Sequence, residues 1–282
     1  MSNLKRKKME EDDRISLLPD CLLRQILSNI NIKQVVQTCV LSKRWKTLWT
    51  HIPALNFLDD GSYGRVHSNH KPTCFKHFVI RVLSEHRGEH IQKLSYVGHD
   101  DLLAESLICH ARRHNVGEIY IHTYVNGFRN TKHCLSGCSS LTVLKISCGV
   151  ADYLGALALP SLKVLEIVNR HWPEDQNVKK NNLDAKFEDM FSGCPNLESL
   201  VLSHHIFRSA TICAPKLYNF ELWPLPNLKH LKLKTKIPTK GTALDIPISI
   251  LAYLQNCPNL ETLAVLNEDE EIPLSKRKDW RF

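Results

Sequence analysis

Long hydrophobic runs are missing from this sequence of 282 residues. The longest, Tyr153 to Leu159, has seven residues counting Gly155, whereas a helix that crosses a bilayer needs about twenty. The first ten residues carry positive charge without an apolar stretch behind them, which argues against a secretory signal. No Asn-x-Ser/Thr glycosylation sequon occurs either. We therefore expect a chain that acts in the nucleus, the cytoplasm or both.

Glycine-rich phosphate-binding motifs are also absent, because neither Gly-x-Gly-x-x-Gly nor Gly-x4-Gly-Lys-Ser/Thr occurs. Ten cysteines are too few for a disulfide scaffold, so we expect reduced and mostly buried thiols. His133, Cys134, Cys138 and Cys148 are spaced in a way that superficially resembles metal ligands. Zinc sites use tighter pairs, and Cys138 has the position of the cysteine in later Cys-Pro-Asn-Leu segments. The sequence predicts no metal and no cofactor.

Charge of one sign is not in large excess. With 37 basic and 29 acidic residues the net charge is +8, which falls short of what nucleic-acid binding usually requires. The only dense basic run, Lys5 to Lys8, is followed at once by acidic residues. Two interpretations stay open for this run: a solvated part of a charged, disordered tail over residues 1–13, and a nuclear localisation signal.

Residues 14–58 have the pattern of three short helices. Pro19 can begin the first helix, Asn31 can cap the second and Ser42 can cap the third. Apolar residues form one stripe on the first helix, and two tryptophans lie on one side of the third. Such short helices enclose only a thin core. The apolar surface therefore either packs on the rest of the chain or docks the helices of a partner.

Two segments of this region, Leu18 to Ser28 and Val40 to Trp49, resemble an F-box. The family pattern is Leu-Pro-x-x-Leu-Leu-x-x-Ile-Leu, a spacer, and Val-Ser-Lys-Arg-Trp-x-x-Leu-Trp, from which this chain departs only by the insertion of Leu41. The module binds the Skp-type adaptor of a cullin–RING ubiquitin ligase. The resemblance implies that the adaptor-binding residues are Leu18, Pro19, Leu22, Leu23, Ile26, Leu27, Val40, Trp45, Leu48 and Trp49.

The rest of the chain contains internal repeats. The fragment Leu-x-x-Leu-x-Leu, or a weaker copy of it, begins eight times, at spacings of 25, 25, 21, 35, 20, 11 and 32 residues. Most spacings are near the roughly 20–29 residues of a leucine-rich repeat, in which stacked strands bury a continuous core. The 11-residue step is too short for a complete repeat, so we expect a tight connection there. An ordinary α/β domain remains the alternative. The fragments start at Ile91, Val116, Leu141, Leu162, Leu197, Leu217, Leu228 and Leu260.

Together these features resemble the plant F-box/LRR family over roughly residues 13–265. The expected fold is α/β: a small three-helix F-box, followed by an irregular leucine-rich-repeat solenoid. The expected domains are the tail 1–13, the F-box 14–58, a helical linker 59–90, the repeats 91–266 and a C-terminal tail 267–282. Many relatives continue into an FBD module, which we expect to be truncated or absent here.

The resemblance implies a non-catalytic substrate receptor of an SCF-type ubiquitin ligase, with the adaptor and an unknown protein target as partners. The alternative is an F-box scaffold that acts outside a ligase. Target recognition is expected on the outward strand positions, because each of them neighbours two buried residues. For Trp223 we also expect an alternative role, covering the 11-residue step. The candidates are Lys93, Tyr120, His122, Lys145, Glu166, Glu221, Trp223, His230, Lys232 and Lys234.

Overall fold

The computed structural model describes residues 14–59, 72–123, 134–135, 137–148, 157–169, 186–203, 209–222, 228–234, 257, 259–267 and 270–274. The tail 1–13 with its basic run, Trp223, and the end of the chain after 274 lie outside the described residues. The chain divides into two compact units, Met1–Ser95 and Tyr96–Phe282. The first unit contains the predicted F-box region and continues beyond it.

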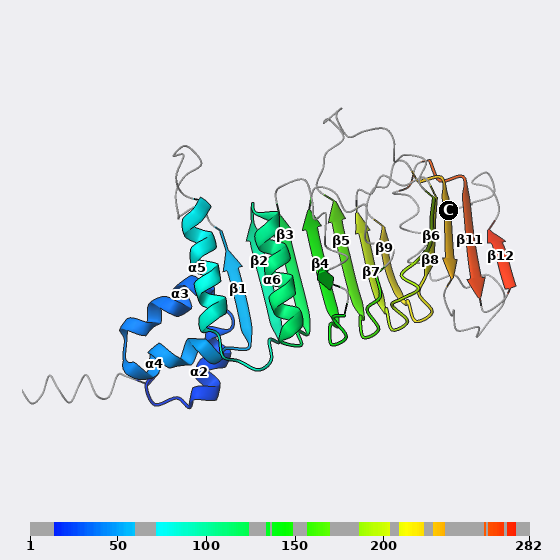
Figure 1. Cartoon of the computed structure of the whole chain (residues 1–282). Helices are drawn as coiled ribbons and strands as arrows, with labels where there is room; N and C mark the ends of the chain where they lie inside the picture. Colours follow the sequence, from blue (N-terminus) through cyan, green and yellow to red (C-terminus); the bar gives the residue numbers. More distant parts are fainter. Residues whose placement is uncertain are drawn as a thin grey trace, which may run out of the picture. The chain divides into compact units, whose positions relative to one another are not determined.

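The first unit begins with short helices, as the sequence predicts (Figure 1). Pro19 precedes the first of them, and the side chain of Asn31 caps the second by accepting a hydrogen bond from the Lys33 amide, 2.9 Å away. Ser42 precedes the third helix, but its side chain makes no capping bond. The elements are α2 (Asp20–Leu27), α3 (Ile32–Gln37), η1 (Thr38–Val40), α4 (Lys43–Leu48), η2 (Trp49–His51), β1 (Ala54–Leu58), α5 (Pro72–Glu85) and the beginning of β2 (Lys93–Gly98).

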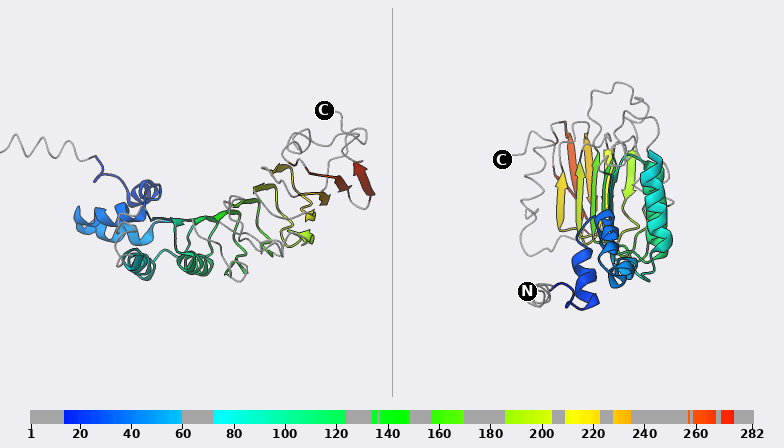
Figure 2. Two further views of the ribbon diagram at one scale, coloured as in Figure 1. Left: turned by 90° about the horizontal axis from the view of Figure 1, so that it is seen from above. Right: turned by 90° about the vertical axis from the view of Figure 1, so that its left-hand side faces the viewer.

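The second unit is built on parallel strands. Each predicted fragment gives a strand that begins two residues after the first apolar residue of the fragment. Helix α6 (Asp101–Arg113) packs against β3, and Figure 2 shows it on one side of the strands. The strands are β3 (Glu118–Thr123), β4 (Val143–Cys148), β5 (Val164–Asn169), β6 (Lys186–Met190), β7 (Ser199–Ser203), β8 (Ser209–Cys213), β9 (Asn219–Leu222), β10 (His230–Lys234), β11 (Thr262–Asn267) and β12 (Glu270–Leu274).

Strand alternation places one row of each strand in the core. The register pairs apolar residues across β3, β4, β5, β7 and β9, so that buried side chains stack from strand to strand. One such row consists of Ile119, Leu144, Leu165, Leu200 and Phe220, all at most 3% exposed.

A turn that recurs before the strands fixes their spacing. In it the amide of the first repeat leucine donates to a carbonyl three residues earlier, as Leu197 does to Cys194 at 3.1 Å. The next two amides donate to one carbonyl of the preceding step: those of Glu198 and Ser199 to Lys163, at 2.8 and 2.9 Å. Buried residues such as Cys194 therefore lie where the chain turns into the sheet, as predicted for the Cys-Pro-Asn-Leu segments.

The predicted single run of repeats is divided between two sheets. One sheet continues through β3, β4, β5, β7 and β9, whereas the other has the order β12-β11-β10-β8-β6. The strands from β5 to β10 alternate between the sheets, so β10 pairs with β8 and β11 and not with β9. The 11-residue step from Leu217 to Leu228 is therefore a change of sheet, because half a repeat leads from one sheet to the other.

No helix in the part of the chain that the structure describes is long and apolar enough to cross a membrane.

Candidate functional site

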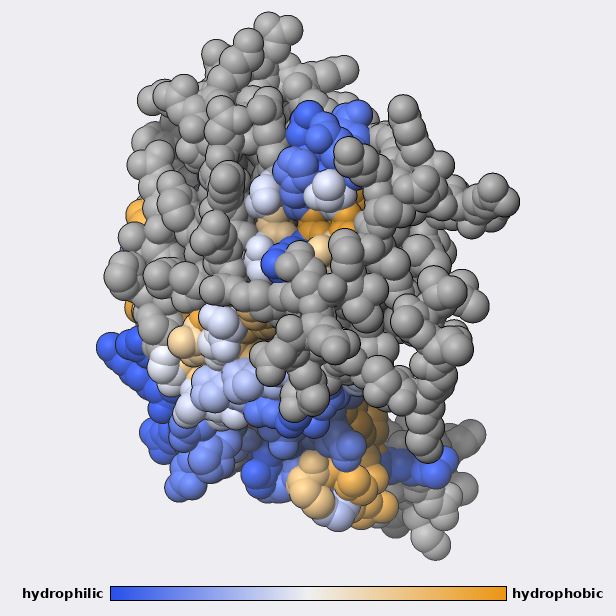
Figure 3. Space-filling model, turned by 90° about the vertical axis from the view of Figure 1, so that its right-hand side faces the viewer, coloured by the Kyte–Doolittle hydropathy of each residue, from blue (hydrophilic) through white to orange (hydrophobic). Residues whose placement is uncertain are grey.

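Large apolar side chains are exposed between residues 15 and 41 of the first unit, and we call them the helical apolar surface. Their exposed fractions range from 38% at Ile30 to 88% at Val40. Figure 3 shows hydrophobic side chains gathered in a patch at the lower edge of the face that it draws. Water-exposed apolar surface is a common mark of a protein interface. The members of the helical apolar surface are Ile15, Leu17, Leu22, Ile26, Ile30, Val40 and Leu41.

Only part of the predicted adaptor-binding set lies on this surface. Leu22, Ile26 and Val40 belong to it, Pro19 is exposed and Leu18 is half-buried. The other five residues are at most 8% exposed and pack in the core of the first unit. These five are Leu23, Leu27, Trp45, Leu48 and Trp49.

The helical period explains this division. Leu22 and Ile26 are four residues apart and occupy one flank of the α2 stripe, while Leu23 and Leu27 occupy the adjacent flank. A periodic pattern shows that both flanks are apolar, but it does not show which of them the chain itself covers. The exposed Ile15, Leu17 and Leu41 had no helical pattern to single them out, and the sequence prediction missed them.

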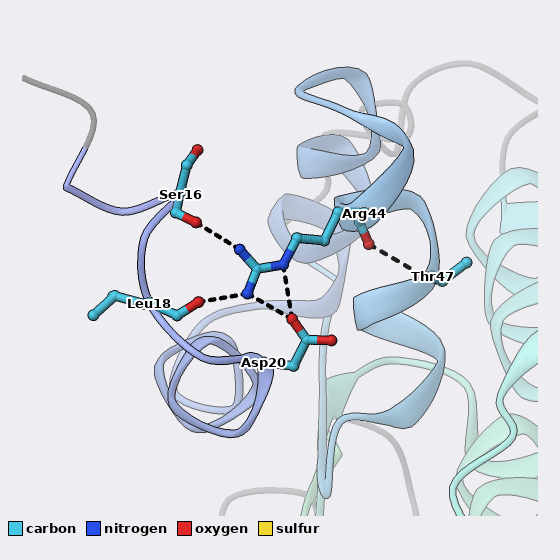
Figure 4. A network of polar contacts seen from close by, with 5 residues as sticks. All are labelled: Ser16, Leu18, Asp20, Arg44 and Thr47. Atoms are coloured by element: carbon cyan, nitrogen blue, oxygen red, sulfur yellow. Dashed lines mark hydrogen bonds and ion pairs between the residues drawn. The ribbon is translucent and has the colours of Figure 1, made fainter. Parts of the chain in front are cut away.

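Arg44 holds the segment before α2 in place (Figure 4). Its guanidinium donates to the backbone carbonyl of Ser16 at 2.7 Å and to that of Leu18. It also pairs with the Asp20 carboxylate, with an Nε–Oδ1 distance of 2.7 Å and an Nη2–Oδ1 distance of 2.6 Å. A planar guanidinium can serve several acceptors at once, which an ammonium cannot do with the same geometry. Arg44 therefore positions Pro19 and the apolar residues around it.

We expect Arg44→Ala to loosen residues 15–19 without unfolding the first unit. Three acceptors lose their donor, but the side chain is 36% exposed, so solvent limits the loss of stability to about 1 kcal/mol. Hydrogen exchange at Leu18, whose amide donates to Ile15, should become at least several-fold faster.

Arg44→Lys should restore this protection only in part. Arg81→Ala is the matched control, because it removes an exposed arginine that pairs with Glu85 on its own helix. Unchanged exchange at Leu18 in Arg44→Ala would show that other contacts order the segment.

Asn56 on β1 is a further residue that sequence reasoning missed. Its side-chain amide donates to the carbonyls of Ser28 and Ile30, at 2.8 and 3.3 Å, and its oxygen accepts from the Ser95 hydroxyl at 2.8 Å. These bonds connect the end of α2 to β1 and β2. The sequence signal that could have identified Asn56 is that it is a single polar residue within an otherwise apolar strand.

A polar row runs across the outward face of β3, β4 and β5. The register places Tyr120 beside Lys145 and Lys145 beside Glu166. Lys145 Nζ lies 2.8 Å from Glu166 Oε2 and 5.9 Å from the centroid of the Tyr120 ring. The hydrogen bond to Glu166 raises the pKa of Lys145, so the ammonium stays charged. Burial, and then the Glu118 carboxylate, raises the pKa of Tyr120, so the phenol stays neutral.

Only some of the other predicted target-binding residues lie on the same sheet as this row. Glu221 lies on β9 of the same sheet and His122 on β3, but His230, Lys232 and Lys234 lie on β10 of the other sheet. Lys93 begins β2 in the first unit. The predicted candidates therefore lie on strands of two different sheets.

The cysteines that resemble metal ligands are core thiols. Burial, helped by the neighbouring Cys109 thiol, raises the pKa of Cys134 to about 12, and burial raises that of Cys138 to about 11. Such thiols stay protonated and are poor nucleophiles. Cys148 is 1% exposed. Within the described ranges no group of three or more histidine, cysteine or acidic side chains could hold a metal ion.

Comparison with known proteins places these features in context. An F-box domain matches residues 15–55. The F-box/FBD/LRR-repeat protein At2g04230 of Arabidopsis thaliana is 29% identical over 263 residues, which is 83% of this chain and 56% of that protein. The putative FBD-associated F-box protein At5g56390 of Arabidopsis thaliana is 32% identical over 270 residues, 90% of this chain and 56% of that protein.

A third relative, F-box/LRR-repeat protein 13 of Arabidopsis thaliana, is 29% identical over 210 residues, 71% of this chain and 43% of that protein. The chain spans about half the length of the curated relatives it matches. The matched F-box lies where the short helices and the exposed apolar residues of the first unit were found. This chain carries an F-box domain and is homologous to the F-box/FBD/LRR-repeat proteins of Arabidopsis thaliana, as a plant F-box/LRR protein would be.

Proposed function

We propose that this chain is the target-recognition subunit of an SCF-type ubiquitin ligase. Its helical apolar surface binds the Skp-type adaptor, and its parallel sheet is that of an irregular leucine-rich-repeat solenoid which holds the target. The chain does no chemistry of its own. It acts by effective concentration, because tethering a target beside the charged ubiquitin carrier makes lysine attack nearly intramolecular. This role calls for a nuclear or cytoplasmic location.

The exposed apolar residues of the first unit are the observation that carries the proposal. Leu17, Val40 and Leu41 are 82%, 88% and 63% exposed, and large apolar side chains exposed in numbers often mark an interface. They lie within the region matched by the F-box model, at residues 15–55. F-box domains bind Skp-type adaptors, and an adaptor that packs on these residues would remove them from water.

The test is binding to a purified plant Skp-type adaptor. We expect Leu22→Ala combined with Ile26→Ala to weaken binding at least about thirtyfold, since truncating a desolvated anchor costs about 2 kcal/mol or more. The matched control is Leu58→Ala with Ile80→Ala, which also removes two exposed apolar residues of the first unit, 42% and 50% exposed. It should change binding less than about threefold, well under 1 kcal/mol.

Calorimetric titration of full-length variants with the adaptor gives both affinities, and circular dichroism confirms that each variant is folded. If the wild-type chain does not bind the adaptor, the ligase proposal fails. If it binds the adaptor but recruits no cullin, the chain is an F-box scaffold outside a ligase.

A further inference from the structure

The outward face of β3, β4, β5, β7 and β9, which we call the sheet face, carries partly exposed side chains. Its strands are parallel, and the register aligns their outward residues in straight rows. The middle row consists of Tyr120, Lys145, Glu166, Val201 and Glu221.

Valines make much of the sheet face apolar. Val143 on β4 pairs directly with Val164 on β5, and Val201 on β7 pairs with Glu166, which lies between Val164 and Val168 on β5. All four valines are partly exposed. β-branched residues favour strands whether or not anything binds them, so the valines alone do not identify a ligand.

The charges on the sheet face do favour one kind of ligand. Three carboxylates, of Glu118, Glu166 and Glu221, share this face with one ammonium group, that of Lys145. Lys145 is engaged by Glu166 at 2.8 Å. Of the remaining carboxylates, Glu118 on β3 accepts a hydrogen bond from the Tyr120 hydroxyl at 3.2 Å, and Glu221 lies on β9. The valines of β4, β5 and β7 therefore lie between acidic groups toward both sides of the face, around the Lys145–Glu166 ion pair.

We propose that the sheet face binds an extended, basic segment of the target, in which lysine or arginine side chains alternate with apolar ones. This inference rests on the proposed function and adds the chemistry of the partner. An extended segment presents alternate side chains to a surface, which matches apolar contacts at the valines interleaved with ion pairs at the carboxylates. Opposite charge would also accelerate the encounter of the two proteins at low salt.

The experiment uses the full chain in complex with its adaptor. A random dodecapeptide library displayed on phage is first depleted on the adaptor alone and then selected on the complex. We expect the selected peptides to be enriched in lysine and arginine relative to the input library. A selected peptide, synthesised with a fluorophore, then serves as the probe in anisotropy titrations against variants of the complex.

Glu221→Lys should weaken binding of the probe at least tenfold, and Glu118→Gln should weaken it several-fold. Glu89→Lys is the matched control, since it makes the same change in net charge at an exposed site of the first unit and should leave affinity within twofold. Selection of neutral or acidic peptides, no enrichment, or equal losses for Glu221→Lys and Glu89→Lys would each overturn the inference. Because adaptor binding is measured separately, these outcomes leave the adaptor test of the proposed function unaffected.

Discussion

Trp49→Ala should destabilise the first unit by about 3–5 kcal/mol, as expected when a large aromatic side chain leaves a cavity in a packed core. Trp49 is 4% exposed and begins η2, directly after the buried Leu48. The short helices around it enclose little apolar volume, so few other contacts can compensate for its loss. Urea denaturation followed by circular dichroism measures the effect.

Val40→Ala is the informative comparison for Trp49→Ala. Val40 is 88% exposed, so its truncation should change stability by less than about 0.5 kcal/mol. In adaptor titrations we expect Val40→Ala to have the larger direct effect, because it weakens binding by a protein that is still folded. Trp49→Ala should weaken binding only to the extent that it unfolds the first unit. A stable Trp49→Ala protein that fails to bind would show that Trp49 contacts the adaptor after all.

Gly193→Ala should destabilise the second unit by about 1–3 kcal/mol, because a methyl group there overlaps backbone atoms. The added Cβ would lie 2.8 Å from the Ala158 Cα and would also overlap the Leu157 carbonyl oxygen. Gly193 forms a parallel bridge with Ala158, and its carbonyl accepts from the Leu159 amide at 3.0 Å. Backbone held on both sides cannot move aside without breaking that bond.

Thermal unfolding of Gly193→Ala should show the lowered transition, with Ser192→Ala as the control. Ser192 is the adjacent residue and is exposed, so its change should be nearly silent. If Gly193→Ala unfolds at the wild-type temperature, the approach of Gly193 to Ala158 is looser than the structure shows.

Those parts of the local structure that depend on sequence periodicity could be predicted from the sequence. The repeat leucines predicted every strand that has the pattern Leu-x-x-Leu-x-Leu, because alternation forces one row inward wherever a strand forms. The predicted Asn31 cap is confirmed for the same reason, since the capping bond involves only neighbouring residues. Strands β1, β6, β8 and β12 were not predicted. β8 (Ser209–Cys213) buries only Ala210 and Ile212, too little apolar surface for a clear signal.

Periodicity does not predict which strands pair with one another in a sheet. Leu231 and Leu233 on β10 have the same pattern as Leu200 and Leu202 on β7, yet the two strands belong to different sheets. A strand presents the same apolar row to either sheet, so only the length of the connection distinguishes them. The division of α2 into a covered and an open flank has the same origin, because the chain covers one flank through contacts distant in sequence.

The shared carbonyl at each turn has a consequence for how this scaffold can vary. Each step of the sheet is positioned by bonds from two successive amides to the step before it, as with Lys163 and Val164 on Thr142, then Glu198 and Ser199 on Lys163. These two steps are separated by 21 and 35 residues in sequence, yet they make the same bonds. The chain between anchor points can therefore lengthen while strand register is preserved. Related proteins could change what surrounds the sheet while folding to the same core.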